Sequence, residues 1–133
     1  MAAPWHKTHW RRILVDAHIP DWDVRFLSQW DPVKFVDNLE RAHVSAAMIY
    51  ANSHVGLCYW PTKSGAMHKG LKGRDMSGEI IAECRRRGMA TIAYYSLIFN
   101  NWAHINHPEW RIVPAGEKRW HPRYGTCCPN SLG

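Results

Sequence analysis

The sequence predicts an α/β fold with a parallel sheet, because its elements follow a β-α-β-α-β order. Three short apolar runs, typical of strands buried on both faces, alternate with two amphipathic helical patterns. Such alternation favours right-handed crossovers, with the helices packed outside the sheet. The chain of 133 residues has room for a single domain, which we expect to cover residues 1–133.

The three predicted strands are continuous apolar runs of five to seven residues. They lie at residues 13–18, 46–50 and 89–95. Each run ends in polar or aromatic side chains and is too short to be a helix of ordinary length. We therefore expect a three-stranded parallel sheet.

Both predicted helices have clear start signals. Asp31, followed by proline, caps the first helix at residues 32–43, and either Asp75 or Ser77 caps the second. Three consecutive arginines end the second helix before Gly88. Cations meet the negative end of the helix dipole there, and glycine supplies the left-handed residue that follows, so the arginine run needs no partner.

The longest connection, residues 48–71, begins as a strand and then loses all periodicity. It contains two histidines, several aromatic residues, three glycines and a proline. Aromatic and histidine content is atypical of disordered segments, and a connection of this length in a compact domain is usually functional. We expect it to form one wall of a ligand site at the carboxyl end of a strand.

Polar side chains follow all three predicted strands. Asp16 and His18 close the first strand, residues 52–54 follow the second, and residues 94–102 follow the third. Because the carboxyl ends of parallel strands meet at one edge of the sheet, these clusters should lie on the same face. The sequence thus predicts the position of a site, without its chemistry.

Side chains suited to sugar recognition occur near these strand ends. The neutral imidazole of His54 can donate one hydrogen bond and accept another, as a sugar hydroxyl requires. Trp60 offers a stacking surface for a sugar, or it packs against the rest of the domain and holds the loop in place. Tyr94 and Tyr95 point to opposite sides of their strand, so at most one should touch a ligand. The chain carries eight tryptophans, of which we expect about half in the core.

The element order is that of the first part of a (β/α)₈ barrel. Such a barrel takes about 250 residues, whereas this chain has 133 and its α/β pattern stops after the third strand. A short helical turn is predicted within residues 104–110. Three parallel strands would also leave two unpaired edges. We therefore expect the chain to be the N-terminal portion of a longer barrel protein.

Several classes of partner are disfavoured by composition. The net charge of +6 comes from scattered basic residues, which argues against a nucleic-acid surface. No apolar run approaches the length of a membrane span, and no secretory signal is recognisable, which favours a cytoplasmic location. The four cysteines lack zinc-site spacing, so reduced thiols and no cofactor are expected. The sequence carries no signal for an oligomeric state.

Two enzyme chemistries can be compared with the available side chains. Asp16 and His18, with His54 or His68, could be ligands of a metal-dependent hydrolase; alternatively, His18 is a buried histidine bonded to a backbone carbonyl. Glycosidases instead need two carboxylates on either side of the scissile bond. Most carboxylates fall on predicted helices or caps, and Asp16 is the one within a strand, so no convincing pair is present.

Five segments resemble the N-terminal part of the barrel glycoside hydrolases related to α-L-fucosidases. The resemblance extends from about residue 12 to residue 130. The segments are VDAH at residues 15–18, YANSHVG at 50–56, YWPTK at 59–63, AYYS at 93–96 and NHPEWR at 106–111. Fucosidases typically have His-His-Asp-Gly-Phe after the second strand, where this chain has Ser-His-Val-Gly-Leu at residues 53–57.

This resemblance implies a carbohydrate substrate and a set of binding residues. His18, His54 and Tyr95 match positions that contact the sugar, and Trp60 and Trp102 would shape the pocket. The nucleophilic carboxylate of such families follows a later strand, beyond this chain. The resemblance therefore implies an N-terminal glycosidase fragment that is inactive alone. The alternatives are the metal-dependent hydrolase and a non-catalytic carbohydrate-binding module.

Overall fold

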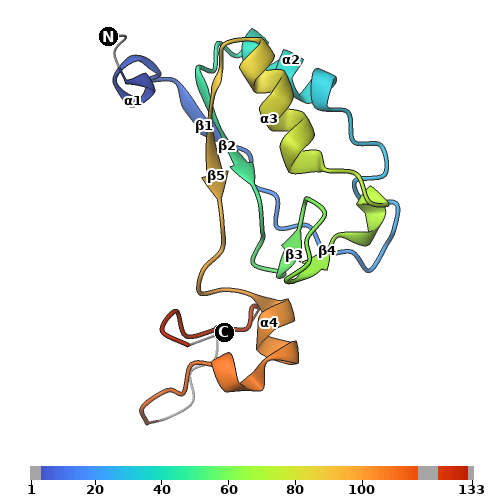
Figure 1. Cartoon of the computed structure of the whole chain (residues 1–133), viewed down its shortest axis with the longest axis vertical. Helices are drawn as coiled ribbons and strands as arrows, with labels where there is room; N and C mark the ends of the chain where they lie inside the picture. The colour runs from blue at the N-terminus through green and yellow to red at the C-terminus, as the bar shows by residue number, and fades with distance from the viewer. Residues whose placement is uncertain (1–3, 117–122, 132–133) are drawn as a thin grey trace.

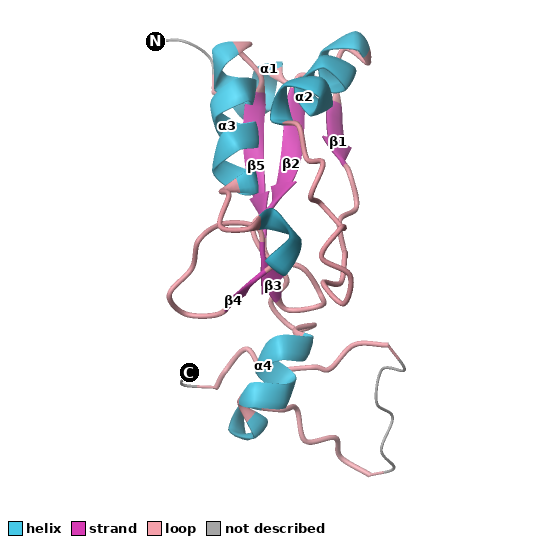
Figure 2. Cartoon of the chain, turned by 90° about the vertical axis from the view of Figure 1, so that its right-hand side faces the viewer, coloured by secondary structure: helices cyan, strands magenta, loops and turns pink. Residues whose placement is uncertain are grey.

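The structure is a computed structural model that describes residues 4–116 and 123–131. Its main sheet contains three parallel strands in the order β1-β2-β5 (Figure 1). Helices α2 and α3 cover one face of this sheet (Figure 2). The elements are α1 (Trp5–Thr8), β1 (Arg12–Leu14), α2 (Pro32–Arg41), β2 (Ala46–Tyr50), β3 (Leu57–Cys58), β4 (Ala66–Met67), η1 (Lys69–Leu71), α3 (Met76–Arg86), β5 (Ala90–Tyr94), α4 (Asn101–Asn106) and η2 (Pro108–Trp110).

The predicted β-α-β-α-β order is confirmed, but the first strand differs from its prediction. β1 is shorter than the predicted strand, and its side chains are exposed, with Ile13 38% and Leu14 45% accessible. β1 pairs with β2 alone, so it is an edge, and the described residues cover only one face of the sheet. The prediction that the strand is buried on both faces is therefore wrong for β1. It agrees best with β2, the central strand, where four of the five residues are buried.

The core lies between the sheet and the two helices. Val36 and Leu39 of α2 and Ile80 and Cys84 of α3 pack toward Ile49 of β2, and all five are buried. These are apolar positions at helical spacing, so the two predicted amphipathic helices are confirmed. Full burial of each aliphatic side chain contributes about 1.5–3 kcal/mol.

The helix starts follow local chemistry. The Asp31 carboxylate accepts a hydrogen bond from the Lys34 amide at 3.0 Å, and Asp75 accepts one from Gly78 at 2.8 Å. Asp75 is thus the cap of α3, because Ser77 is instead buried and donates its hydroxyl to the Tyr50 carbonyl oxygen at 2.7 Å. That bond ties α3 to the end of β2.

The arginine run at the end of α3 has specific partners, contrary to the expectation from the helix dipole alone. The Arg87 side chain is 9% exposed and reaches Glu83 at 2.6 Å, Asp37 at 2.5 Å and Glu40 at 2.7 Å. Hydrogen bonds from Arg86 and Arg87 hold the pKa of Glu83 at about 2. Arg87 therefore connects α3 to α2, a contact that depends on packing between residues distant in sequence.

The long connection after β2 is ordered and partly buried. Two-residue strands β3 and β4 pair in parallel, and the 3-10 turn η1 follows. Tyr59 and Leu71 are among the most buried side chains described. The Tyr59 hydroxyl donates to the Ala17 carbonyl oxygen and accepts from the Ile19 amide. Strands of two residues are too short to produce a periodic pattern, which is why the sequence reads as irregular.

His68, one possible metal ligand, has a structural role in this connection. It is 1% exposed; its Nδ1 accepts from the Gly70 amide at 3.1 Å, and its Nε2 lies 3.1 Å from the Pro20 carbonyl oxygen. Because Nδ1 accepts, the neutral ring donates from Nε2 to Pro20. His68 thus joins two loops, and both of its ring nitrogens are engaged.

The expectation that about half of the tryptophans are core residues is wrong for the part of the chain that the structure describes. Seven tryptophans fall there and none is buried; Trp120 lies outside the described residues. The space between sheet and helices is filled mainly by smaller side chains. The tryptophans lie instead on α1, the lead-in, the connections, α4 and η2.

The segment after β5 forms a small unit beyond the carboxyl ends of the strands (Figure 1). Asn100 caps α4, and η2 follows, so the helical turn predicted within residues 104–110 starts earlier than expected. The Asn101 amide donates to the His54 carbonyl oxygen at 3.1 Å. This bond attaches α4 to the connection after β2. No helix in the described ranges is long and apolar enough to cross a bilayer.

Candidate functional site

Polar side chains from the ends of β1, β2 and β5 meet at one edge of the sheet, as predicted. His18 lies beyond β1 and His54 beyond β2, and their rings stack with centroids 3.8 Å apart and planes 25° apart. Tyr50 and Tyr94, which are register partners on β2 and β5, stack beneath them at 4.2 Å. These four rings, with Asp16 and Ser96, are called the histidine cluster below.

A backbone amide fixes the tautomer of His18. The His54 N–H donates to Nδ1 of His18 at 3.0 Å, so the neutral ring of His18 carries its proton on Nε2. Nε2 lies 3.4 Å from the Asp16 carboxylate and 3.4 Å from the Tyr50 hydroxyl. Burial lowers the pKa of His18, and Asp16 partly opposes that effect. His18 therefore presents a hydrogen-bond donor.

Tyr50 and Asp16 form the second anchor of the cluster. The Tyr50 hydroxyl donates to Asp16 Oδ1 at 2.8 Å, which lowers the pKa of Asp16. Burial, together with this bond, raises the pKa of Tyr50. Asp16 is thus an anion and Tyr50 a neutral donor at neutral pH. The Asp16 side chain remains 72% exposed, so its second oxygen faces solvent.

Ser96 fixes the tautomer of His54 in the opposite sense. The Ser96 hydroxyl donates to the Phe99 carbonyl oxygen at 2.6 Å, so its oxygen accepts from Nδ1 of His54, 2.5 Å away. The neutral ring of His54 then carries a lone pair on Nε2. The two stacked imidazoles therefore have opposed tautomers, one with a donor Nε2 and one with an acceptor Nε2. A sugar hydroxyl can satisfy both kinds of group.

The structure places Tyr94, and not Tyr95, in the histidine cluster. The Tyr94 hydroxyl lies 3.5 Å from Nδ1 of His54, whereas Tyr95 is 59% exposed and lies on the other side of the chain. The predicted alternation of the two tyrosines is thus observed. Tyr50 and Tyr94 pair across the sheet, so they share a face; aligning the starts of β2 and β5 in the sequence could have found this pair.

Trp60, Trp102 and Tyr95 lie together at a second place. They line a cavity of about 80 Å³ between the connection after β2 and the α4–η2 unit. Gly56, two residues after His54, also lines it. The five predicted binding residues therefore divide into the histidine pair and this aromatic group, which we call the tryptophan pocket.

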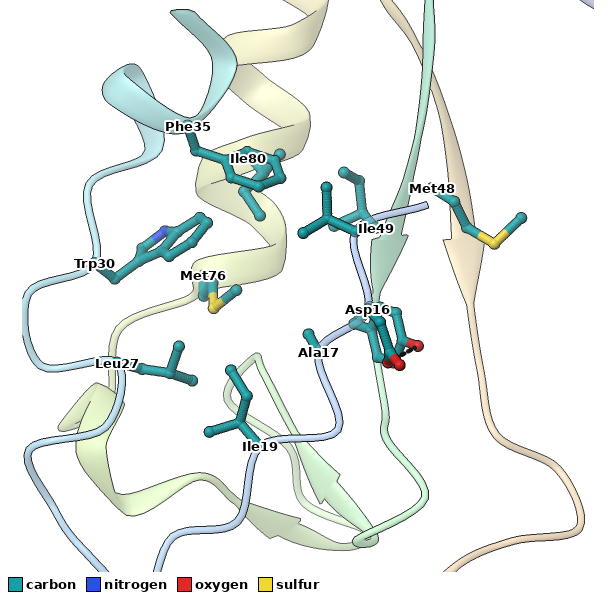
Figure 3. Close-up of a pocket in the computed structure, with 12 residues that line it drawn as sticks. Asp16, Ala17, Ile19, Leu27, Trp30, Phe35, Met48, Ile49, Met76 and Ile80 are labelled. Carbon is teal, nitrogen blue, oxygen red and sulfur yellow. Dashed lines mark hydrogen bonds between the residues drawn. The ribbon is translucent and has the colours of Figure 1, made fainter. Parts of the chain in front are cut away.

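A second cavity, of about 100 Å³, lies between the sheet and the helices (Figure 3). Leu27, Trp30, Phe35 and Ile80 line it, and Asp16 sits at its edge, bonded to Tyr50. Its lining is almost wholly apolar and lacks converging polar groups, which sugar hydroxyls would require. This cavity reflects incomplete packing of the helix–sheet layer.

The histidine cluster does not form a metal centre or a glycosidase carboxylate pair from the described residues. No group of three or more His, Cys, Asp or Glu side chains there is arranged to hold a metal ion. Asp21 and Asp23 lie in the loop between β1 and α2, and both are in ion pairs: Asp21 pairs with Lys69 and Asp23 with Arg25. Asp16 is therefore the sole carboxylate of the cluster as described.

Acidification should destabilise the fold through two histidines, the partly buried His18 and the buried His68. Burial lowers the pKa of both His18 and His68. The unfolded chain, with histidine pKa values near 6.5, then binds more protons than the native one. Stability is full above that value and is lost as the pH falls toward the native values. Urea unfolding should give a lower free energy of unfolding at pH 5 than at pH 7.5.

Single substitutions test which histidines cause this pH dependence of stability. The change His18→Asn should reduce it, because only the contribution of His68 then remains, while His6→Asn, at an exposed position, should leave it unchanged. A free energy of unfolding that stays constant or rises between pH 7.5 and pH 5 would contradict the lowered pKa values of His18 and His68.

The fold places this protein in the parallel α/β class. In proteins of this class, sites lie at the carboxyl ends of the strands, where the histidine cluster is found. The profile of a family described as hypothetical glycosyl hydrolase 6 matches residues 31–132. The chain belongs to this family. The match confirms the glycoside hydrolase resemblance predicted from the sequence. No curated protein matches the chain.

Comparison with solved structures finds fucosidases. The α-L-fucosidase isoenzyme 2 from Paenibacillus thiaminolyticus shares the fold, with a TM-score of 0.81 and 21% identity, over 90% of this chain and 19% of that protein. The Thermotoga maritima α-fucosidase in complex with fucose matches with a TM-score of 0.48 and 26% identity, over 55% of this chain and 18% of that protein. The chain thus spans about a fifth of the fucosidases that it matches.

Proposed function

We propose that the chain is the N-terminal portion of a (β/α)₈ glycoside hydrolase similar to α-L-fucosidases, and that residues 1–133 belong to that one barrel domain. In this role it supplies sugar-binding groups to the active site. A downstream strand supplies the nucleophilic carboxylate that attacks the anomeric carbon. The family match and the fold similarity to a fucosidase support the proposal.

The single observation that carries this proposal is the stacked pair of His18 and His54. The two rings come from the ends of different strands and are held by a backbone amide and by Ser96. Their opposed tautomers suit hydroxyl groups, each of which donates one hydrogen bond and accepts others. Preorganised donors and acceptors of this kind favour binding because little ordering is needed on association.

In this proposal the chain binds and orients the sugar but does not supply the nucleophile. Glycosidases need an acid and a nucleophile or base, with carboxyl groups about 5–9.5 Å apart. Asp16 is ionised and hydrogen-bonded to Tyr50, which suits positioning His18 better than protonating a leaving group. His18 and His54 would bind and orient hydroxyls of the sugar, and the chain alone should not turn over aryl glycosides.

Binding of L-fucose tests the proposal on the 133-residue chain labelled at histidine. Titration should shift the imidazole resonances of His18 and His54, and the mirror-image sugar D-fucose should shift them less. The change His54→Ala should weaken binding about tenfold, since a lost hydrogen bond of about 1.4 kcal/mol corresponds to that factor. Turnover of an aryl glycoside by the chain alone would contradict placing the nucleophile downstream.

The matched control is His6→Ala, because His6 is exposed on α1. This variant should bind L-fucose as the unmodified chain does. Equal affinity of His54→Ala and the unmodified chain, or an equal response to both enantiomers, would remove the histidine pair as a sugar-binding group.

A further inference from the structure

The tryptophan pocket contains a buried polar group with an unmet hydrogen bond. Asn52 is 2% exposed and lines this cavity, and its Oδ1 has no hydrogen-bond partner among the described residues. Its Nδ2 has only a weak acceptor, the Cys58 sulfur, at 3.7 Å. An unsatisfied buried polar group of this kind costs about 1–3 kcal/mol. A partner that occupies the cavity would recover that free energy.

The chemistry of the amide selects a hydroxyl as that partner. The Oδ1 of Asn52 needs a donor, and its Nδ2, which has the weak Cys58 sulfur as its acceptor, can use a better one. A hydroxyl serves both, because it donates one hydrogen bond and accepts others. A carboxylate, which only accepts, or an ammonium group, which only donates, can serve one of these two atoms alone.

The shape and lining of the cavity further restrict which ligands can fit. Its volume of about 80 Å³ has room for a few waters or one short polar arm, which is less than a whole sugar ring needs. Trp60, Trp102 and Trp110 line it, and aromatic side chains suit the C–H-rich parts of a sugar. Trp60 is 38% and Tyr95 59% exposed, so the cavity opens to solvent on their side.

We propose that the tryptophan pocket is a second saccharide subsite, which takes the hydroxymethyl arm of a hexose, with its primary hydroxyl bonded to Asn52. The ring of that hexose lies at the mouth, against Trp60 and Tyr95. Gly56 lines the pocket two residues from His54, so the pocket and the histidine cluster are built partly from the same connection. The inference rests on the proposed function in taking the ligand to be a saccharide.

The test compares D-galactose with D-fucose, which is the same sugar without the primary hydroxyl. The probe is the full chain with its tryptophan indoles labelled by ¹⁵N. D-galactose should shift the indole resonances of Trp60, Trp102 and Trp110, and D-fucose should bind about tenfold more weakly or not at all. Equal responses to the two sugars, or no indole response to D-galactose, would overturn the subsite.

Substitutions at the pocket sharpen the result. The change Asn52→Leu keeps the side-chain size and removes the unmet polar group, so it should retain the fold while weakening D-galactose binding about tenfold. If that variant does not fold, Trp60→Ala, at a partly exposed position, serves instead, with Trp22→Ala as its control because Trp22 is 76% exposed and outside the pocket. Unchanged D-galactose binding in the pocket variant would overturn the assignment.

The two saccharide proposals fail separately. L-fucose binding at the histidine cluster is measured on imidazole resonances, and D-galactose binding at the tryptophan pocket on indole resonances. Loss of the imidazole response with a retained indole response would remove the histidine pair and keep the subsite. The reverse pattern would remove the subsite and keep the proposed function.

Discussion

The substitution Gly70→Ala is expected to lower the free energy of unfolding by about 3 kcal/mol, a large fraction of the roughly 5–15 kcal/mol that stabilises a native protein. Gly70 is buried in η1, and a Cβ atom there would overlap the Phe26 carbonyl oxygen. The obstacle is backbone, which cannot rotate away as a flexible side chain can. Two connections distant in sequence would have to separate.

Gly73→Ala is the matched control, three residues away. Gly73 has φ +86°, but apart from its chain neighbours no atom of the described residues lies within 4 Å of the position that a Cβ atom would take, so the cost is left-handed strain, about 1–2 kcal/mol. Urea unfolding followed by circular dichroism measures both variants. Equal losses of stability would mean that the contact between Gly70 and Phe26 does not limit the fold.

The second large effect is expected from Gly56→Ala. Gly56 has φ +87°, and a Cβ atom would lie 2.5 Å from the Trp102 amide nitrogen and overlap the Asn100 side chain. Both neighbours belong to the start of α4. The change should therefore detach the α4–η2 unit from the connection after β2 while the helix–sheet core persists, and it should open the tryptophan pocket.

Amide hydrogen exchange measures this detachment. Exchange in α4 should accelerate by at least about tenfold, since loss of about 1.4 kcal/mol in local stability gives that factor. Exchange in α3 should change far less. The control is Gly116→Ala, where φ is +86° and, apart from the chain neighbours, no atom of the described residues lies within 4 Å of the added group. Parallel acceleration in α3 and α4 would show that the two parts unfold as one unit.

The predicted parts of the fold depend on short-range patterns. β2 has the predicted bounds because an apolar run set between two turns leaves little choice of ends. The Asp31 cap and the proline after it are signals within four residues of each other. Local chemistry of this kind is readable without knowing what packs nearby. The exposure of β1 was missed because burial depends on neighbours that the sequence does not specify.

The features of the candidate site likewise divide into those that the sequence predicts and those that depend on tertiary contacts. The sequence by itself determined that His18 and His54 follow neighbouring parallel strands, because strand order places their ends on one edge. Tertiary structure alone decided that the rings stack, that Tyr94 joins them, and that Trp60 and Trp102 line a separate cavity with Asn52. It also decided the opposed tautomers, because the His54 amide and the Ser96 hydroxyl reach their partners only once the chain has folded.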